Sequence, residues 1–62
     1  MIIYFRQDTP FSMQSELLHH IKRKGFKAII DHNKLFTDAN KNDIAPDIEL
    51  FKQWISKTKE AI

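Results

Sequence analysis

The first half of the chain alternates between short apolar runs and one amphipathic segment. Ile2 to Phe5 is an unbroken run of β-branched and aromatic residues, a pattern typical of a strand that is buried on both faces. From Met13 to Lys24 the apolar residues recur at helical spacing. Gly25 follows, at the place where a helix end favours a left-handed residue. Phe26 to Ile30 is a second apolar run, so we expect a strand, a helix and a second strand in this order.

Such a succession forms a βαβ unit, in which the two strands are parallel neighbours joined by a right-handed crossover. The chain has 62 residues, a length near the lower limit for burying a core. We therefore expect an α/β fold with residues 1–62 as a single small domain. Because a small sheet leaves its edges open, we also expect the chain to pair with itself or with a partner.

The segment from Asp31 to Ile44 is the hardest to assign. It is rich in Asn and in charged residues around one apolar pair, Leu35-Phe36. This composition favours a short helix capped by Asn33, followed by a loop over Asn40 to Asp43.

Two patterns compete in the last part of the chain. Pro46 suits a first helical position, with acidic residues directly after it and lysines near the end of the segment. The alternation from Asp47 to Phe51 is instead typical of a strand. The local signals favour a helix from about Asp47 to about Lys59.

The turn from Arg6 to Ser12 is the candidate site, because α/β folds place ligands at the junction of a strand and a helix. Thr9 is a good N-cap residue, and Pro10 suits the first helical position. The residues around this helix start surround the positive end of its dipole, and Arg6 adds a cation nearby. The turn is thus suited to hold a carboxylate or a phosphate.

The stretch Ile3 to Ser12, followed by a helix that ends in Lys24-Gly25-Phe26, resembles the opening of glutaredoxins and NrdH-type redoxins. Those proteins have an apolar strand, a basic residue, a Cys-Pro-aromatic-Cys tetrapeptide and a helix. Thr9-Pro10-Phe11-Ser12 matches the middle of that tetrapeptide, and both cysteines are replaced. Ala45-Pro46 matches the pair that carries the family's cis-proline. The resemblance implies an abbreviated thioredoxin-like βαβ unit with a C-terminal helix.

The chain contains no cysteine, and thiol–disulfide exchange needs a sulfur nucleophile. The resemblance therefore implies a redox-inactive, glutaredoxin-like binding module that is not an enzyme, with glutathione as the one small molecule suggested by the family. A protein partner is expected, and the abundance of Lys and Asn suits a phage or mobile-element regulator. The expected contact surface consists of Arg6, Thr9, Pro10, Phe11, Ser12, Ala45 and Pro46.

A small basic module for nucleic acid is the alternative. The net charge is +2, from ten Lys and Arg against eight Asp and Glu, and the basic residues that would serve are Lys22, Arg23, Lys24, Lys27 and Lys34. Lysines in a last helical turn also simply suit the helix dipole. Along the chain, stacking aromatics do not alternate with these basic residues.

Metal binding and membrane insertion are not expected. His19 and His20 are adjacent and would point about 100° apart on a helix, which does not suit a zinc pair, and His32 lies elsewhere. No apolar run approaches the ~20 residues of a membrane span, and the first residues lack the pattern of a signal peptide. We therefore expect a soluble, cytoplasmic protein without a metal.

Overall fold

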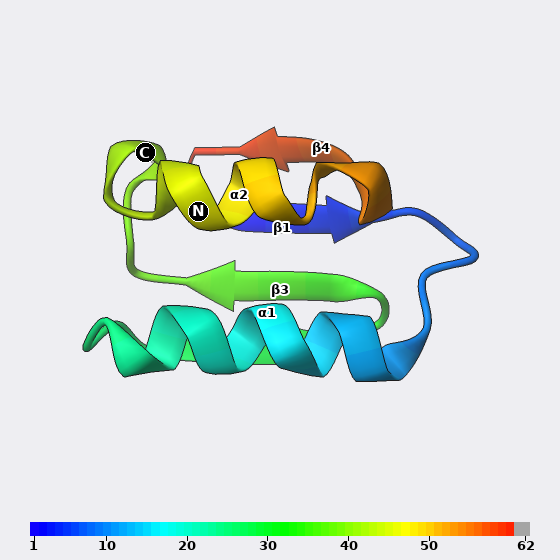
Figure 1. Cartoon of the computed structure of the whole chain (residues 1–62), viewed down its shortest axis with the longest axis horizontal. Helices are drawn as coiled ribbons and strands as arrows, with labels where there is room; N and C mark the ends of the chain where they lie inside the picture. Colours follow the sequence, from blue (N-terminus) through cyan, green and yellow to red (C-terminus); the bar gives the residue numbers. More distant parts are fainter. Residues whose placement is uncertain (61–62) are drawn as a thin grey trace.

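The computed structural model describes residues 1–60. Its elements, in chain order, are β1 (Ile2–Phe5), α1 (Phe11–Arg23), β2 (Ala28–Asp31), β3 (Lys34–Thr37), the 3₁₀-helix η1 (Lys41–Ile44), α2 (Ala45–Leu50), the 3₁₀-helix η2 (Lys52–Trp54) and β4 (Ile55–Lys59). The strands form an antiparallel sheet in the order β2-β3-β1-β4. Both α-helices lie on the same side of this sheet (Figure 1).

The strand β3 lies between β1 and β2 and runs antiparallel to both. As a result β1 and β2 run in the same direction without pairing, and β4 pairs with the free edge of β1. This order of elements and strands is that of the split βαβ, or ferredoxin-like, arrangement. The prediction of a mixed α/β fold is confirmed, whereas the prediction that β1 and β2 are parallel neighbours is wrong.

A two-residue hairpin is the reason for this difference. Asp31 pairs with Lys34, and the two residues between them, His32 and Asn33, have φ angles of 50° and 66°. Two successive residues in the left-handed backbone conformation form the tight turn whose twist matches that of the flanking strands. The expected short helix capped by Asn33 is therefore wrong, and Lys34 to Thr37 returns along β2 as a strand.

The side chain of Asn33 fixes this hairpin against the rest of the protein. Its Nδ2 donates to the carbonyls of Phe5 and Arg6, both at 3.1 Å, while its Oδ1 accepts from Nε2 of Gln14 at 2.5 Å. Gln14 is a buried polar residue of α1. The hairpin is thus tied both to the end of β1 and to the helix.

The predicted helix over 47–59 is right only at its start. The helix α2 ends at Leu50, and Ile55–Lys59 forms β4 against β1. The alternative strand over Asp47 to Phe51 is wrong, because that segment belongs to α2 and the turn after it. The strand forms later, at β4, where the free edge of β1 offers a partner and tertiary pairing overrides local propensity. The carbonyl of Trp54 anchors the entry to β4, because it accepts from the amide of Arg6 at 2.8 Å and from the hydroxyl of Thr9 at 3.0 Å.

The two ends of α1 differ in how well the sequence predicts them. Gly25 has a φ of +95°, and its amide donates to the carbonyl of Lys22 at 2.9 Å, as expected for a helix end. At the start, Pro10 occupies the N-cap position in extended conformation, and no side chain caps the helix. The predicted cap by Thr9 is wrong, because that hydroxyl is used by Trp54. All peptide bonds in residues 1–60 are trans, including the one before Pro46.

The core lies between the sheet and the helices, and its largest fully buried side chains are Ile3, Leu17, Ile21, Leu35 and Ile44. Burial alternates along β1, where Ile3 and Phe5 are buried and Ile2 and Tyr4 are half-buried. The prediction that this strand is covered on both faces is therefore wrong. The face of the sheet opposite the helices is left open within residues 1–60. None of the helices in that part of the chain combines the length and the apolarity needed to span a bilayer.

A buried carboxylate joins the two helices. Asp47 in α2 is 6% exposed, and its oxygens lie 2.5 Å from Nζ of Lys24 and 3.3 Å from Nδ1 of His20. The ring of His20 also packs edge-on against Phe51, with centroids 5.4 Å apart. His20 thus has a structural role between α1 and α2, and no cluster of three or more metal-ligating side chains occurs among residues 1–60.

We expect Asp47→Ala to lower the free energy of unfolding by about 1–3 kcal/mol, because it leaves polar partners in the helix interface unpaired. Glu49→Ala is the matched control, since Glu49 is an exposed residue of the same helix whose ion pair within residues 1–60 is with exposed Lys52. Its effect should stay below about 0.5 kcal/mol. Urea denaturation followed by circular dichroism measures both free energies. Equal losses of stability in the two variants would contradict the role of Asp47 in joining the two helices.

Candidate functional site

The open face of the sheet is defined by two rows of side chains that point away from the helices. Residues paired across neighbouring strands point to the same side of a sheet. The register therefore aligns one row as Ile29, Phe36, Ile2 and Lys59, and the next row as Asp31, Lys34, Tyr4 and Lys57. We call these eight residues the open face.

Tyr4 lies in the middle of the open face, between two lysines. The Nζ atom of Lys57 is 4.9 Å from the centre of its ring, and that of Lys34 is 5.6 Å away. Both distances fall within the range of a cation–π interaction. Because Lys34 belongs to β3 and Lys57 to β4, the aromatic ring is flanked by an ammonium group on each neighbouring strand.

A second aromatic side chain, Phe36, lies beside Tyr4. Met1 and Thr37 exchange both backbone hydrogen bonds, at 2.8 and 3.0 Å. The next pair, Ile2 and Phe36, is therefore a closely spaced, non-hydrogen-bonded pair. Phe36 is the diagonal neighbour of Tyr4, at a spacing of about 7–8 Å in antiparallel sheets. Two aromatic side chains from the two central strands thus share one surface.

The charge on the open face is unevenly distributed. Lys34, Lys57 and Lys59 form no ion pair with any described residue. The carboxylate of Asp31 lies at the β2 side, where it pairs with Nδ1 of His32 at 2.8 Å. The part of the face built from β1, β3 and β4 is therefore positive and aromatic.

A shallow hollow adjoins Phe36 at the β2 side of the open face. Its lining consists of Lys27, Ala28, Ile29, Phe36, Thr37 and Asp38. Ile29 is 64% exposed, although it is a large apolar residue in the sheet. The hollow thus combines an apolar floor with charged groups at its rim.

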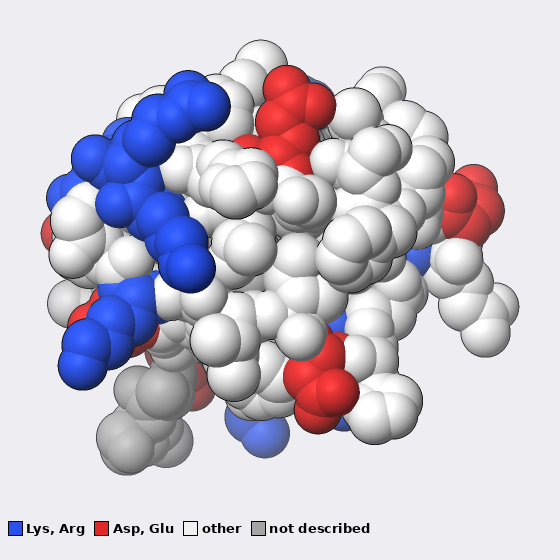
Figure 2. Space-filling model, turned by 90° about the horizontal axis from the view of Figure 1, so that it is seen from below, with Lys and Arg blue, Asp and Glu red and all other residues white. Residues whose placement is uncertain are grey.

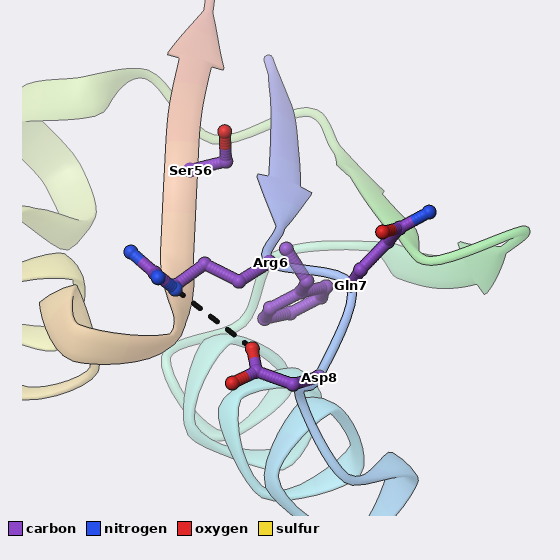
Figure 3. Close-up of a pocket in the computed structure, with 5 residues that line it drawn as sticks. Arg6, Gln7, Asp8 and Ser56 are labelled. Atoms are coloured by element: carbon purple, nitrogen blue, oxygen red, sulfur yellow. Dashed lines mark ion pairs between the residues drawn. The ribbon is translucent and has the colours of Figure 1, made fainter.

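The loop from Arg6 to Asp8, which the sequence indicated as part of the site, forms a different surface. With Phe5 and Ser56 it lines an open hollow at the end of β1, next to the bulge in the β1–β4 pairing. Nε of Arg6 lies 3.8 Å from Asp8 Oδ1, and both side chains are mostly exposed. Figure 3 shows Arg6 reaching toward β4, whereas Gln7 points away.

The other residues of the predicted contact surface are scattered. Thr9 is buried and hydrogen-bonded to Trp54, whereas Pro10, Phe11 and Ser12 are exposed around the start of α1. Ala45-Pro46 is exposed at the start of α2. The start of α2 lies toward the opposite end of the molecule from the loop between β1 and α1 (Figure 1). The structure does not bring the two halves of this surface together, and binding of a protein or of glutathione there stays a prediction.

The basic residues of the alternative prediction also separate into two groups. Lys22 and Arg23 lie in the last turn of α1, with Lys24 and Lys27 just beyond it. Figure 2 shows basic side chains gathered at one end of the molecule, where α1 finishes in Figure 1. Lys24 is engaged by Asp47. Lys34 belongs instead to the open face, on β3.

Sequence reasoning missed the aromatic and basic residues Tyr4, Phe36, Lys57 and Lys59 of the open face, and also its apolar residues Ile2 and Ile29. Burial alternates along β3 in the structure, but its two apolar residues, Leu35 and Phe36, are adjacent in the sequence. No apolar–polar alternation therefore marked this strand. Comparison of the chain with models of known protein families, with curated proteins and with solved structures gives no match.

Proposed function

We propose that the protein binds single-stranded nucleic acid on the open face of its sheet. The observation that carries this proposal is Tyr4, whose ring has lysine ammonium groups 4.9 and 5.6 Å from its centre and Phe36 as a neighbour. Unpaired bases stack on aromatic rings, and their phosphates bind nearby cations, so a ring flanked by lysines suits both parts of a nucleotide.

The chemistry of such a face has two parts. Bases stack on aromatic rings, and each stack contributes about 1–3 kcal/mol whatever the base. Lysines neutralise the phosphates between the stacked bases and release counterions. RNA-recognition domains use the same principle, with aromatic residues of a four-stranded sheet that stack two or three bases. The open face offers both parts on one surface.

The apolar residues of the open face favour a single strand over a duplex. Ile29 is 64% exposed, and Ile2 and Phe36 are half-buried. A duplex presents mainly phosphates to a flat surface, because its bases are already stacked and paired. Unpaired bases can instead cover these apolar side chains, which gains hydrophobic free energy. Single-stranded RNA and single-stranded DNA share this chemistry.

Fluorescence anisotropy with labelled oligonucleotides of about ten nucleotides tests the proposal. We expect single-stranded probes to bind more tightly than a duplex of the same sequence, and parallel RNA and DNA arms show which backbone is preferred. Tighter binding of the duplex would contradict the proposal.

We further expect the affinity to fall with salt between about 50 and 200 mM, with a logarithmic slope of about −2 for three lysines. Removing two of them, Lys57→Ala with Lys59→Ala, should reduce the slope to about −0.7. The charge-matched control is Lys22→Ala with Arg23→Ala, at the end of α1. The proposal fails if this control makes the salt dependence shallower and the β4 variant does not.

A protein partner at the loop between β1 and α1 is the second candidate. The observation that favours it is Phe11, a large apolar side chain that is 69% exposed directly after this loop. This surface does not overlap the open face, so the two proposals can be tested separately.

A further inference from the structure

We infer that the hollow beside Phe36 selects a base with an exocyclic amino group, and that Asp38 determines this preference. The inference rests on the proposed function, because it assigns one base of the bound strand to this hollow. It concerns the hollow lined by Lys27, Ala28, Ile29, Phe36, Thr37 and Asp38.

The floor of the hollow suits the flat surface of a base. Phe36 supplies an aromatic side chain, and Ile29, its partner across the β2–β3 ladder, supplies exposed apolar surface. The lysines of β4 lie on the other side of β1 from this hollow. A nucleotide with its phosphate near Lys59 would therefore direct its base across Ile2 and Phe36 toward the hollow.

The carboxylate of Asp38 is held in a defined orientation at the rim. Its Oδ1 accepts from the backbone amide of Lys27 at 2.9 Å, and the amide of Asp38 donates back to the carbonyl of Lys27 at 3.4 Å. The hydroxyl of Thr37 donates to the same carbonyl at 2.7 Å. These bonds engage one carboxylate oxygen, and Oδ2, which has no hydrogen-bond partner among the described residues, can accept from a ligand.

A carboxylate oxygen can only accept hydrogen bonds. It therefore favours a base edge that carries an amino group, such as N4 of cytosine, and disfavours a carbonyl at the same position, such as O4 of uracil. Cytosine and uracil have the same size and stack similarly, so they differ mainly in this group. The ammonium group of Lys27, at the same rim, is available to an acceptor on the base.

The test compares binding of two RNA probes, oligouridine and the same oligomer with cytidine in place of uridine. We expect the cytidine probe to bind about tenfold more tightly, the size of one hydrogen bond to a charged group. In Asp38→Asn, the amide oxygen can keep the bond to Lys27, and the NH₂ group then faces the ligand as a donor. The preference for cytidine should therefore be lost or reversed toward uridine.

Asp8→Asn is the matched control, because Asp8 is an exposed carboxylate of the loop between β1 and α1, outside both the open face and this hollow. It should keep the preference of the parent protein. Equal binding of both probes by the parent protein, or an unchanged preference in Asp38→Asn, would overturn the inference and leave the proposed function standing. Failure of every single-stranded probe to bind would overturn the proposed function itself.

Discussion

Replacing Tyr4 and Phe36 together by alanine is expected to weaken binding of single-stranded nucleic acid by about 100-fold or more. Each stacked base contributes about 1–3 kcal/mol, and every 1.4 kcal/mol corresponds to about tenfold in affinity. Both rings lie on the open face and are only half-buried. Their loss removes the stacking surface and leaves the lysines in place, so the remaining binding should be weak and governed by salt.

The control for this variant is Phe11→Ala, which removes an aromatic side chain that is 69% exposed at the start of α1. Its affinity should equal that of the parent protein. Thermal melting establishes that the variant at Tyr4 and Phe36 is folded before binding is compared. A folded double variant with undiminished affinity would contradict the proposed function. A dimer of the parent protein that dissociates in the double variant would also contradict it, because a second copy would then cover the open face.

The second large effect concerns the core. Leu17→Ala is expected to abolish cooperative folding or to lower the melting temperature severely. Leu17 is fully buried on α1, and truncation of a buried leucine costs about 2–5 kcal/mol. A domain of this length has a total stability of only roughly 3–9 kcal/mol. The loss is therefore comparable with the whole free energy of unfolding.

Leu50→Ala makes the same chemical change at a site that is 66% exposed, at the end of α2. Its stability should change by less than about 0.5 kcal/mol. Thermal denaturation followed by circular dichroism distinguishes the two variants. Similar melting curves for both would contradict the position of the core between the sheet and the helices.

Local signals in the sequence predict individual elements well where several of them agree. The helix α1 has an amphipathic pattern and is followed by Gly25, whose φ of +95° matches the requirement of a helix end. The apolar run that begins at Ile2 coincides with β1, and the run from Phe26 to Ile30 overlaps β2. In these segments the periodicity, the composition and the residues that end a helix or strand all indicate the same structure.

The order of the strands was not predictable in this way. It depends on the left-handed pair His32 and Asn33, two residue types that tolerate this conformation but also occur widely in other conformations. It also depends on β4, whose residues Ile55 to Lys59 become a strand because the edge of β1 is free to pair. Both features are set by tertiary contacts, which no local pattern contains.

The open face was missed for the same reason. Lysines alternate with an aromatic residue across the strands, from Lys34 on β3 through Tyr4 on β1 to Lys57 on β4. Along the chain these residues are separated by long intervals. Only the register of the sheet brings them together, and it also separates the residues of the two surfaces that the sequence suggested.

The most direct test of the account is an amide NMR titration of the isotopically labelled protein with a single-stranded oligonucleotide. We predict saturable shifts of the amides on the open face, at Tyr4, Lys34, Phe36 and Lys57. Saturable shifts confined to the loop before α1, at Phe11 and Ser12, or to the basic end of that helix, with the open face unchanged, would contradict it.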